Sequence, residues 1–118
     1  MATPSDSLSL QVTIHLNHED LPKFWAAFQP AYEAVIAEPE CTFFEVYEDP
    51  NAPGTLSWVE NWSASPEWLL GVQAKKPYYH DYLAATEPLY VKPREIKLLK
   101  RVGGPFVMVK KVNGGLSD

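Results

Sequence analysis

Apolar and polar residues alternate strictly near the start of the chain, which is the pattern of a β-strand with one buried face. From residue 8 to residue 16 every even position is apolar and every odd position is polar. The period then changes, because apolar residues recur three and four positions apart from Leu21 to Ile36, which predicts a helix of about four to five turns. Pro30 lies inside this pattern. Since proline removes a backbone N–H, we expect the helix to kink or split near Gln29.

Three more strand patterns and a second helical region follow. Strands are expected over residues 41–47 and 55–62, and the turn between them is rich in Pro, Asn and Gly, which favours an antiparallel hairpin. A second helix is expected to begin near Pro66, to be interrupted at Pro77 and to continue as a shorter helical piece. A fourth strand is expected over residues 94–102.

The order strand, helix, strand, strand, helix, strand predicts an α+β fold, a ferredoxin-like βαββαβ sandwich. It has an antiparallel four-stranded sheet with the helices on one face. Residues 106–112 have the composition of an extra C-terminal strand, which must pair with its own sheet or cross to another subunit. We expect one domain over residues 1–118, with its core at about 8–102 and an extension over 103–118.

Composition narrows the possible partners. The 118 residues are 46% hydrophobic and carry a net charge of −5, so the field around the protein repels phosphate backbones, and we expect no nucleic-acid partner. The apolar runs are far shorter than the roughly 20 residues that span a bilayer, so we expect no membrane association and a cytoplasmic location. The single cysteine, Cys41, excludes an internal disulfide and a multi-cysteine zinc site.

Two segments carry a likeness to a known family. The sequence from Glu38 to Pro50, EPECTFFEVYEDP, and the sequence from Val59 to Glu67, VENWSASPE, resemble the antibiotic biosynthesis monooxygenase (ABM) domain of the dimeric α/β-barrel superfamily. The resemblance covers roughly residues 8–102. This chain has Glu40 where the family usually has Gly, and Gln73 and Pro77-Tyr78 where it usually has His and a Pro-His pair.

The resemblance implies a homodimer of two sheets packed face to face, with a pocket between sheet and helices in each subunit. Some members oxygenate anthrone-like aromatic polyketides with molecular oxygen and without flavin or metal. The expected function is therefore a cofactor-independent monooxygenase that acts on an aromatic or polyketide-type small molecule in secondary metabolism. The alternatives are a polyketide cyclase or isomerase of the same fold, and a non-catalytic dimeric module that binds a ligand.

Such chemistry needs a base, and two histidines are candidates. His80 lies among tyrosines in the second helical region, and His15 lies on the polar face of the first strand. Either imidazole can take a proton near neutral pH, although each can equally be a surface or structural residue. We favour His80 because neighbouring tyrosines are typical of a pocket wall. The three histidines and one cysteine show no paired ligand spacing, so we expect no metal site.

Asn61 and Trp62 lie in the strand that borders the pocket in the resembling family. Asn61 offers an amide that can hold an oxyanion, and Trp62 offers a flat wall for a ring. Because neighbouring residues of a strand face opposite sides, only one of the two can reach the cavity.

Glu60 shares a strand face with Trp58 and Trp62. A carboxyl group beside two indoles would have a raised pKa and can serve as a base. It can also pair with Lys97 or Arg94 of a neighbouring strand, and we favour this ion pair.

Five further aromatic residues are candidates for binding a ring-shaped substrate, although aromatic residues at such spacing are core residues more often. They are Tyr47, Tyr32, Tyr78, Trp25 and Trp68. The hydroxyls of Tyr32 and Tyr47 need partners when buried, and a hydroxylated aromatic substrate can supply them.

Overall fold

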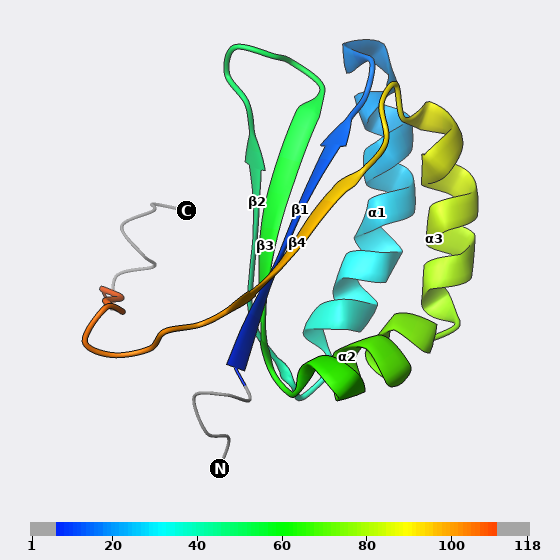
Figure 1. The fold of residues 1–118 in the computed structure, drawn as a ribbon. Helices are drawn as coiled ribbons and strands as arrows, with labels where there is room; N and C mark the ends of the chain where they lie inside the picture. The colour runs from blue at the N-terminus through cyan, green and yellow to red at the C-terminus, as the bar shows by residue number, and fades with distance from the viewer. Residues whose placement is uncertain (1–6, 111–118) are drawn as a thin grey trace.

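The computed structural model describes residues 7–110, which form an antiparallel four-stranded sheet with its helices on one face (Figure 1). The strand order across the sheet is β2-β3-β1-β4. The strands are β1 (Ser7–His15), β2 (Cys41–Glu48), β3 (Thr55–Ser63) and β4 (Glu95–Lys100). This topology confirms the ferredoxin-like α+β prediction, including the hairpin of β2 and β3.

The helical layer consists of three α-helices and short 3-10 turns. They are η2 (His18–Asp20), α1 (Leu21–Ile36), α2 (Pro66–Gly71), η3 (Gln73–Lys75), α3 (Tyr78–Thr86) and η4 (Glu87–Leu89). Ser65 caps α2, because its hydroxyl accepts a hydrogen bond of 3.1 Å from the backbone N–H of Trp68. Within residues 7–110, no helix combines the length and the apolar character needed to cross a bilayer.

The split expected at Pro30 does not occur, because α1 runs continuously from Leu21 to Ile36. Phe28 and Ala31, on either side of the proline, are both buried. Tertiary packing of one apolar face therefore holds the two halves in a single helix despite the lost hydrogen bond.

The core lies between the helices and the even-numbered face of β1 and β3. Ile14, Phe24 and Trp62 are fully buried there. This is the face that the alternation of β1 predicted, since residues two apart in a strand point to the same side. The opposite face of the sheet carries the odd-numbered residues and has no helix over it (Figure 1).

Gly54 closes the loop between β2 and β3 against the end of β1. Its φ of 97° lies in the left-handed region, and a Cβ atom there would collide with the carbonyl oxygen of Leu16. The Leu16 N–H donates to the Gly54 carbonyl at 2.9 Å, so the loop is fastened to β1.

Residues 101–110, here called the C-terminal arm, leave the sheet after β4 and run out on the side opposite the helices (Figure 1). The Arg101 N–H donates to the Ser7 carbonyl at 3.1 Å. Of the two alternatives for the extra strand expected over residues 106–112, pairing with its own sheet is wrong for the described part, because residues 106–110 form no strand within the single chain. A crossing to another subunit stays a prediction. A strand requires a partner edge, whereas the arm makes a tight turn in which the Phe106 N–H donates to the Gly103 carbonyl at 2.9 Å and Gly103 has a φ of 84°. Residues 111 and 112 lie outside the described residues.

Candidate functional site

A pocket of about 280 Å³ lies between the sheet and the helices α2 and α3. Its walls are mostly apolar, with Leu10 and Val12 from β1 and Leu69 and Leu83 from the helices. Ile96 and Leu98 of β4 also line it and are exposed, although their strand positions face the helical layer. The helices therefore leave the edge strand uncovered, and the pocket opens along β4.

Glu60 is the only carboxylate among the residues that line this pocket, and its side chain is held by two indoles. It is 7% exposed. The Trp58 Nε1–H donates to Oε2 at 2.8 Å, and the Trp62 Nε1–H donates to Oε1 at 3.0 Å. The three side chains meet because residues two apart in β3 share one face. The expected ion pair is therefore wrong: within residues 7–110, neither Lys97 nor Arg94 forms a salt bridge with Glu60. Lys97 lies on the other face of the sheet.

The environment of Glu60 favours a proton acceptor. Burial raises the pKa of its carboxyl group, and the hydrogen bonds from Trp58 and Trp62 only partly oppose this rise. A carboxylate with a raised pKa is a stronger base, because its pKa is closer to the pH at which the enzyme works. This acceptor lies in apolar surroundings, where charge is poorly screened.

A second polar cluster lies at the wall formed by η3 and α3. The amide nitrogen Nε2 of Gln73 lies 2.6 Å from the Tyr78 hydroxyl oxygen and 2.8 Å from that of Tyr79. The Tyr78 hydroxyl donates to Oε2 of Glu38 at 2.8 Å, and Nζ of Lys76 is 3.4 Å from the same oxygen. Burial raises the pKa of Tyr78 to about 12, so the phenol stays protonated at neutral pH.

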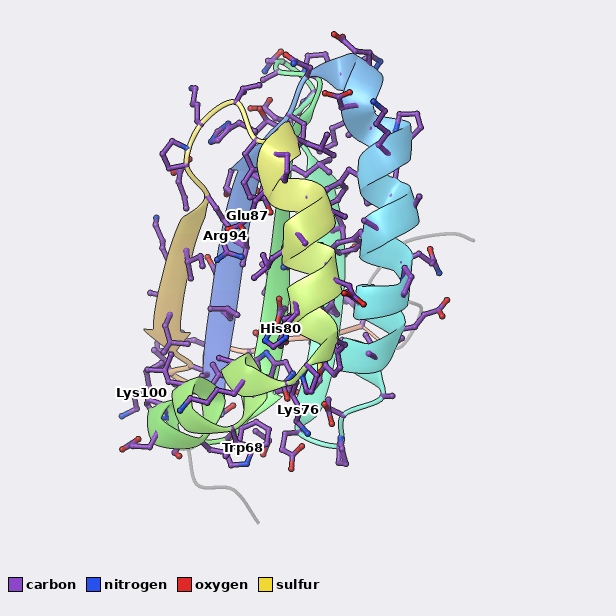
Figure 2. All side chains as sticks on the ribbon, turned by 90° about the vertical axis from the view of Figure 1, so that its right-hand side faces the viewer. Trp68, Lys76, His80, Glu87, Arg94 and Lys100 are labelled. Carbon is purple, nitrogen blue, oxygen red and sulfur yellow. The ribbon has the colours of Figure 1, made fainter. Side chains whose placement is uncertain are left out.

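Tyr82 and Arg94 complete the polar lining of the pocket. The Tyr82 hydroxyl is buried and finds no hydrogen-bond partner within residues 7–110. Burial raises the pKa of this phenol, and the positive charge of Arg94 partly opposes the rise. Arg94 is exposed just before β4, and Figure 2 shows it between β4 and α3. It thus brings a cation to the rim of an otherwise apolar pocket.

The structure places the three predicted catalytic residues outside this pocket. His80 is exposed on α3 (Figure 2). His15 lies on the opposite face of the sheet, where its Nε2 is 2.6 Å from Oε2 of Glu95. Asn61 lies on that same face, so the alternation that brings Trp62 to the pocket takes Asn61 away.

Of the predicted binding residues, Trp62 lines the pocket and Tyr78 supports its wall through Gln73. The other four lie elsewhere. Tyr32 stacks on Phe28, Trp25 packs edge-on against Phe24, Trp68 packs 6.2 Å from the Trp62 ring, and Tyr47 donates to Glu45 on the helix-free face.

Gln73, Tyr82 and Arg94 were missed as candidates for the pocket. The Trp-x-Glu-x-Trp spacing predicts the environment of Glu60. The resemblance singled out the position of Gln73, where the family usually has His, but no local pattern marks Tyr82 or Arg94. The three residues come together only through the packing of η3, α3 and the end of the loop before β4 on the sheet. Among residues 7–110, no three His, Cys, Asp or Glu side chains gather closely enough to hold a metal ion.

Comparison with known proteins places the chain in a family. It is 37% identical over 103 residues to a protein of Pestalotiopsis microspora named "Putative monooxygenase GME11364", covering 87% of this chain and 86% of that protein. It is 26% identical over 95 residues to the uncharacterized protein sll1783 of Synechocystis, covering 80% of this chain and 63% of that protein. No family model matches the chain.

Solved structures agree on the fold. Two of them, from Caulobacter crescentus and Nitrosomonas europaea, are each named "putative antibiotic biosynthesis monooxygenase". The first superposes with a TM-score of 0.74 at 17% identity, over 84% of this chain and 92% of that one. The second has a TM-score of 0.73 at 13% identity, over 86% of this chain and 96% of that one. The chain belongs to the same family as the Pestalotiopsis microspora protein named "Putative monooxygenase GME11364", and it has the fold of the antibiotic biosynthesis monooxygenase structures.

Proposed function

We propose that this protein is a cofactor-independent monooxygenase that oxidises an aromatic or polyketide-type small molecule of secondary metabolism, with Glu60 as the general base. The observation that carries the proposal is a buried carboxylate, held by two indole N–H groups, inside an apolar pocket that opens at β4. Pockets that hold a ring-shaped ligand are mostly apolar and carry a few placed polar groups. The names of the relatives support an oxygenase rather than another activity.

The reaction balances with dioxygen as the oxidant. A methylene group between two aromatic rings loses a proton to the Glu60 carboxylate, and the resulting carbanion is electron-rich enough to reduce dioxygen. One oxygen atom stays on the carbon as a carbonyl, and the other leaves as water with the two methylene hydrogens. The CH₂ group and O₂ thus become C=O and H₂O.

Charge at the pocket supports the proton transfer. The substrate becomes an anion when Glu60 becomes neutral, so a negative charge moves from the carboxylate to the ring system. Arg94 lines the same pocket, and its guanidinium can stabilise that anion at the rim. Tyr82 adds a buried hydroxyl that can donate to the developing oxyanion.

We also propose that the protein works as a homodimer whose two sheets pack through the helix-free face. Phe43, Tyr47 and Leu99 on this face are each more than 40% exposed: 42%, 45% and 46% respectively. Burying such side chains against a second copy would remove them from water.

Oxygen uptake in the presence of anthrone tests the activity. The full chain should consume dioxygen faster than the heat-denatured protein, and mass spectrometry should find a product in which CH₂ has become C=O. Glu60→Gln should lose most of this uptake. Glu33→Gln is the matched control, because it alters an exposed carboxylate of α1 and should retain the uptake.

Two results would contradict the proposal. Conversion at the same rate without oxygen would exclude an oxygenase, and a product of unchanged mass would favour an isomerase or cyclase. If no anthrone, hydroquinone or naphthol probe were converted or bound, a non-catalytic module that does not take aromatic ligands would be the better account.

A further inference from the structure

Gln73 occupies an unusual position for a polar side chain. It lies in η3, between α2 and α3, and it lines the pocket although it is only 2% exposed. Buried amides normally satisfy both their nitrogen and their oxygen with hydrogen bonds. In Gln73 the amide nitrogen makes two hydrogen bonds, whereas the amide oxygen has no partner within residues 7–110.

The orientation of the amide follows from its neighbours. The Tyr78 hydroxyl has one proton, which it donates to Oε2 of Glu38 at 2.8 Å. Toward Gln73 the same hydroxyl can therefore only accept, so the group that faces it at 2.6 Å must be the amide nitrogen. Nζ of Lys76 lies 3.4 Å from the same Glu38 oxygen and holds it in place to accept this proton.

The oxygen of Gln73 is thereby directed away from the tyrosines. The second proton of Nε2 goes to the Tyr79 hydroxyl at 2.8 Å, so both amide protons are used on one side. Oε1 is buried and finds no hydrogen-bond partner within residues 7–110. A buried acceptor without a partner costs free energy, and a ligand that supplies a donor would recover it.

We propose that Gln73 determines substrate specificity, with its Oε1 accepting a hydrogen bond from a hydroxyl group of the aromatic substrate. This hydroxyl is separate from the acidic C–H or O–H group that gives its proton to Glu60 in the same pocket. This inference rests on the proposed function only for the aromatic class of the ligand. It adds that the substrate carries this second polar group, and that Glu38 and Tyr78 are positioning residues that keep Oε1 turned away from the tyrosines.

Discrimination follows from burial. Oε1 is already buried and unpaired in the free protein, so a ring without the second hydroxyl gains nothing there. A ring that carries this hydroxyl supplies the missing donor and binds more tightly.

Equilibrium binding of naphthalene derivatives tests this role without any turnover. Isothermal titration calorimetry under argon would compare 1-naphthol and 2-naphthol with the dihydroxynaphthalenes that carry a second hydroxyl at each ring position. At least one diol should bind the wild-type chain about 10-fold more tightly than its parent naphthol. Gln73→Met keeps the length of the side chain without the acceptor and should abolish this preference. Gln29→Met makes the same change at an exposed position of α1 and should keep it.

A second variant separates positioning from folding. Tyr78→Phe leaves Gln73 intact but frees its amide to turn, so the preference for the diol, measured as the ratio of the two Kd values, should fall. If no diol gains affinity in the wild type, or if Gln73→Met retains the full gain, the proposal is wrong. Because binding is measured without oxygen, a chain that shows the preference but never oxygenates anthrone would overturn the proposed function and leave this inference standing.

Discussion

The two faces of the sheet are built from the same strands, yet they serve different purposes. On the helix-covered face, the even-numbered residues of β1 and β3 pack into a core that leaves a pocket beside it, and a carboxylate is buried there. On the helix-free face, the odd-numbered residues pair polar groups with one another, such as the partly buried Thr13 and Ser57 hydroxyls at 2.8 Å and His15 with the exposed Glu95. The contrast shows that the pKa and the hydrogen-bond partners of a polar strand residue depend on whether other elements cover that face of the sheet.

The same contrast explains two glutamates. Glu60 is buried, and its pKa is raised because burial penalises its charge. The pKa of Glu95 is lowered by the hydrogen bond from His15, and its side chain is exposed. Only the first environment makes a carboxylate a better proton acceptor, and only that one borders a pocket.

The largest effect is expected from removing the base on the helix-covered face. Glu60→Gln should reduce kcat by about 10²- to 10⁴-fold, because a positioned general base contributes that much. The variants His15→Gln and Asn61→Ala, on the other face, should change kcat by less than about 3-fold. Steady-state oxygen uptake measures all three. If His15→Gln lowered kcat more than Glu60→Gln did, the base would be His15, and the catalytic group would lie on the helix-free face.

The next effect concerns the helix-free face and the C-terminal arm. Removing residues 105–118 should convert a dimer into a monomer or an aggregate, because this part of the arm exposes Phe106, Met108 and Val109 on the side where the second copy would pack. Size-exclusion chromatography with light scattering reports the mass. An unaltered dimer after this deletion would show that the arm takes no part in the interface.

A smaller effect is expected in the dependence of stability on pH. The folded-state pKa of Glu60 lies above its ordinary value of 4.5, so the folded chain holds this proton more tightly than the unfolded chain. The stabilisation is fully present below pH 4.5 and is lost as pH rises through the folded-state pKa. Urea unfolding should therefore show that the stability of the wild type falls relative to that of Glu60→Gln over this interval. Parallel curves for the two proteins would mean that the pKa is not raised.

The smallest effect is expected at His80. Because its side chain is exposed on α3 and lies outside the pocket lining, His80→Ala should change kcat and the free energy of unfolding by little, about 0.5 kcal/mol or less for the latter. Oxygen uptake and urea unfolding check this. If His80→Ala lost as much activity as Glu60→Gln, the catalytic base would be His80 instead of Glu60.

Most of the fold was predictable from sequence because its signals are local. The alternation over residues 8–16 predicts β1 and its buried face, and the three-and-four spacing predicts α1. The arm does not pair with its own sheet although its residues have strand composition, because pairing depends on a partner edge that composition does not specify. The histidines were favoured for their titration range, which says nothing of the face on which they lie.

The sequence by itself determined which residues share a strand face, and so placed Glu60 between Trp58 and Trp62. This follows because the two-residue period of a strand is a property of the backbone. Only the tertiary structure decided that this face would hold the pocket, that Arg94 would stand at its rim, and that Gln73 would turn its oxygen away from Tyr78. These outcomes depend on groups far apart in the chain, such as Tyr78 and Glu38, which are 40 positions apart and meet only when the helices pack on the sheet.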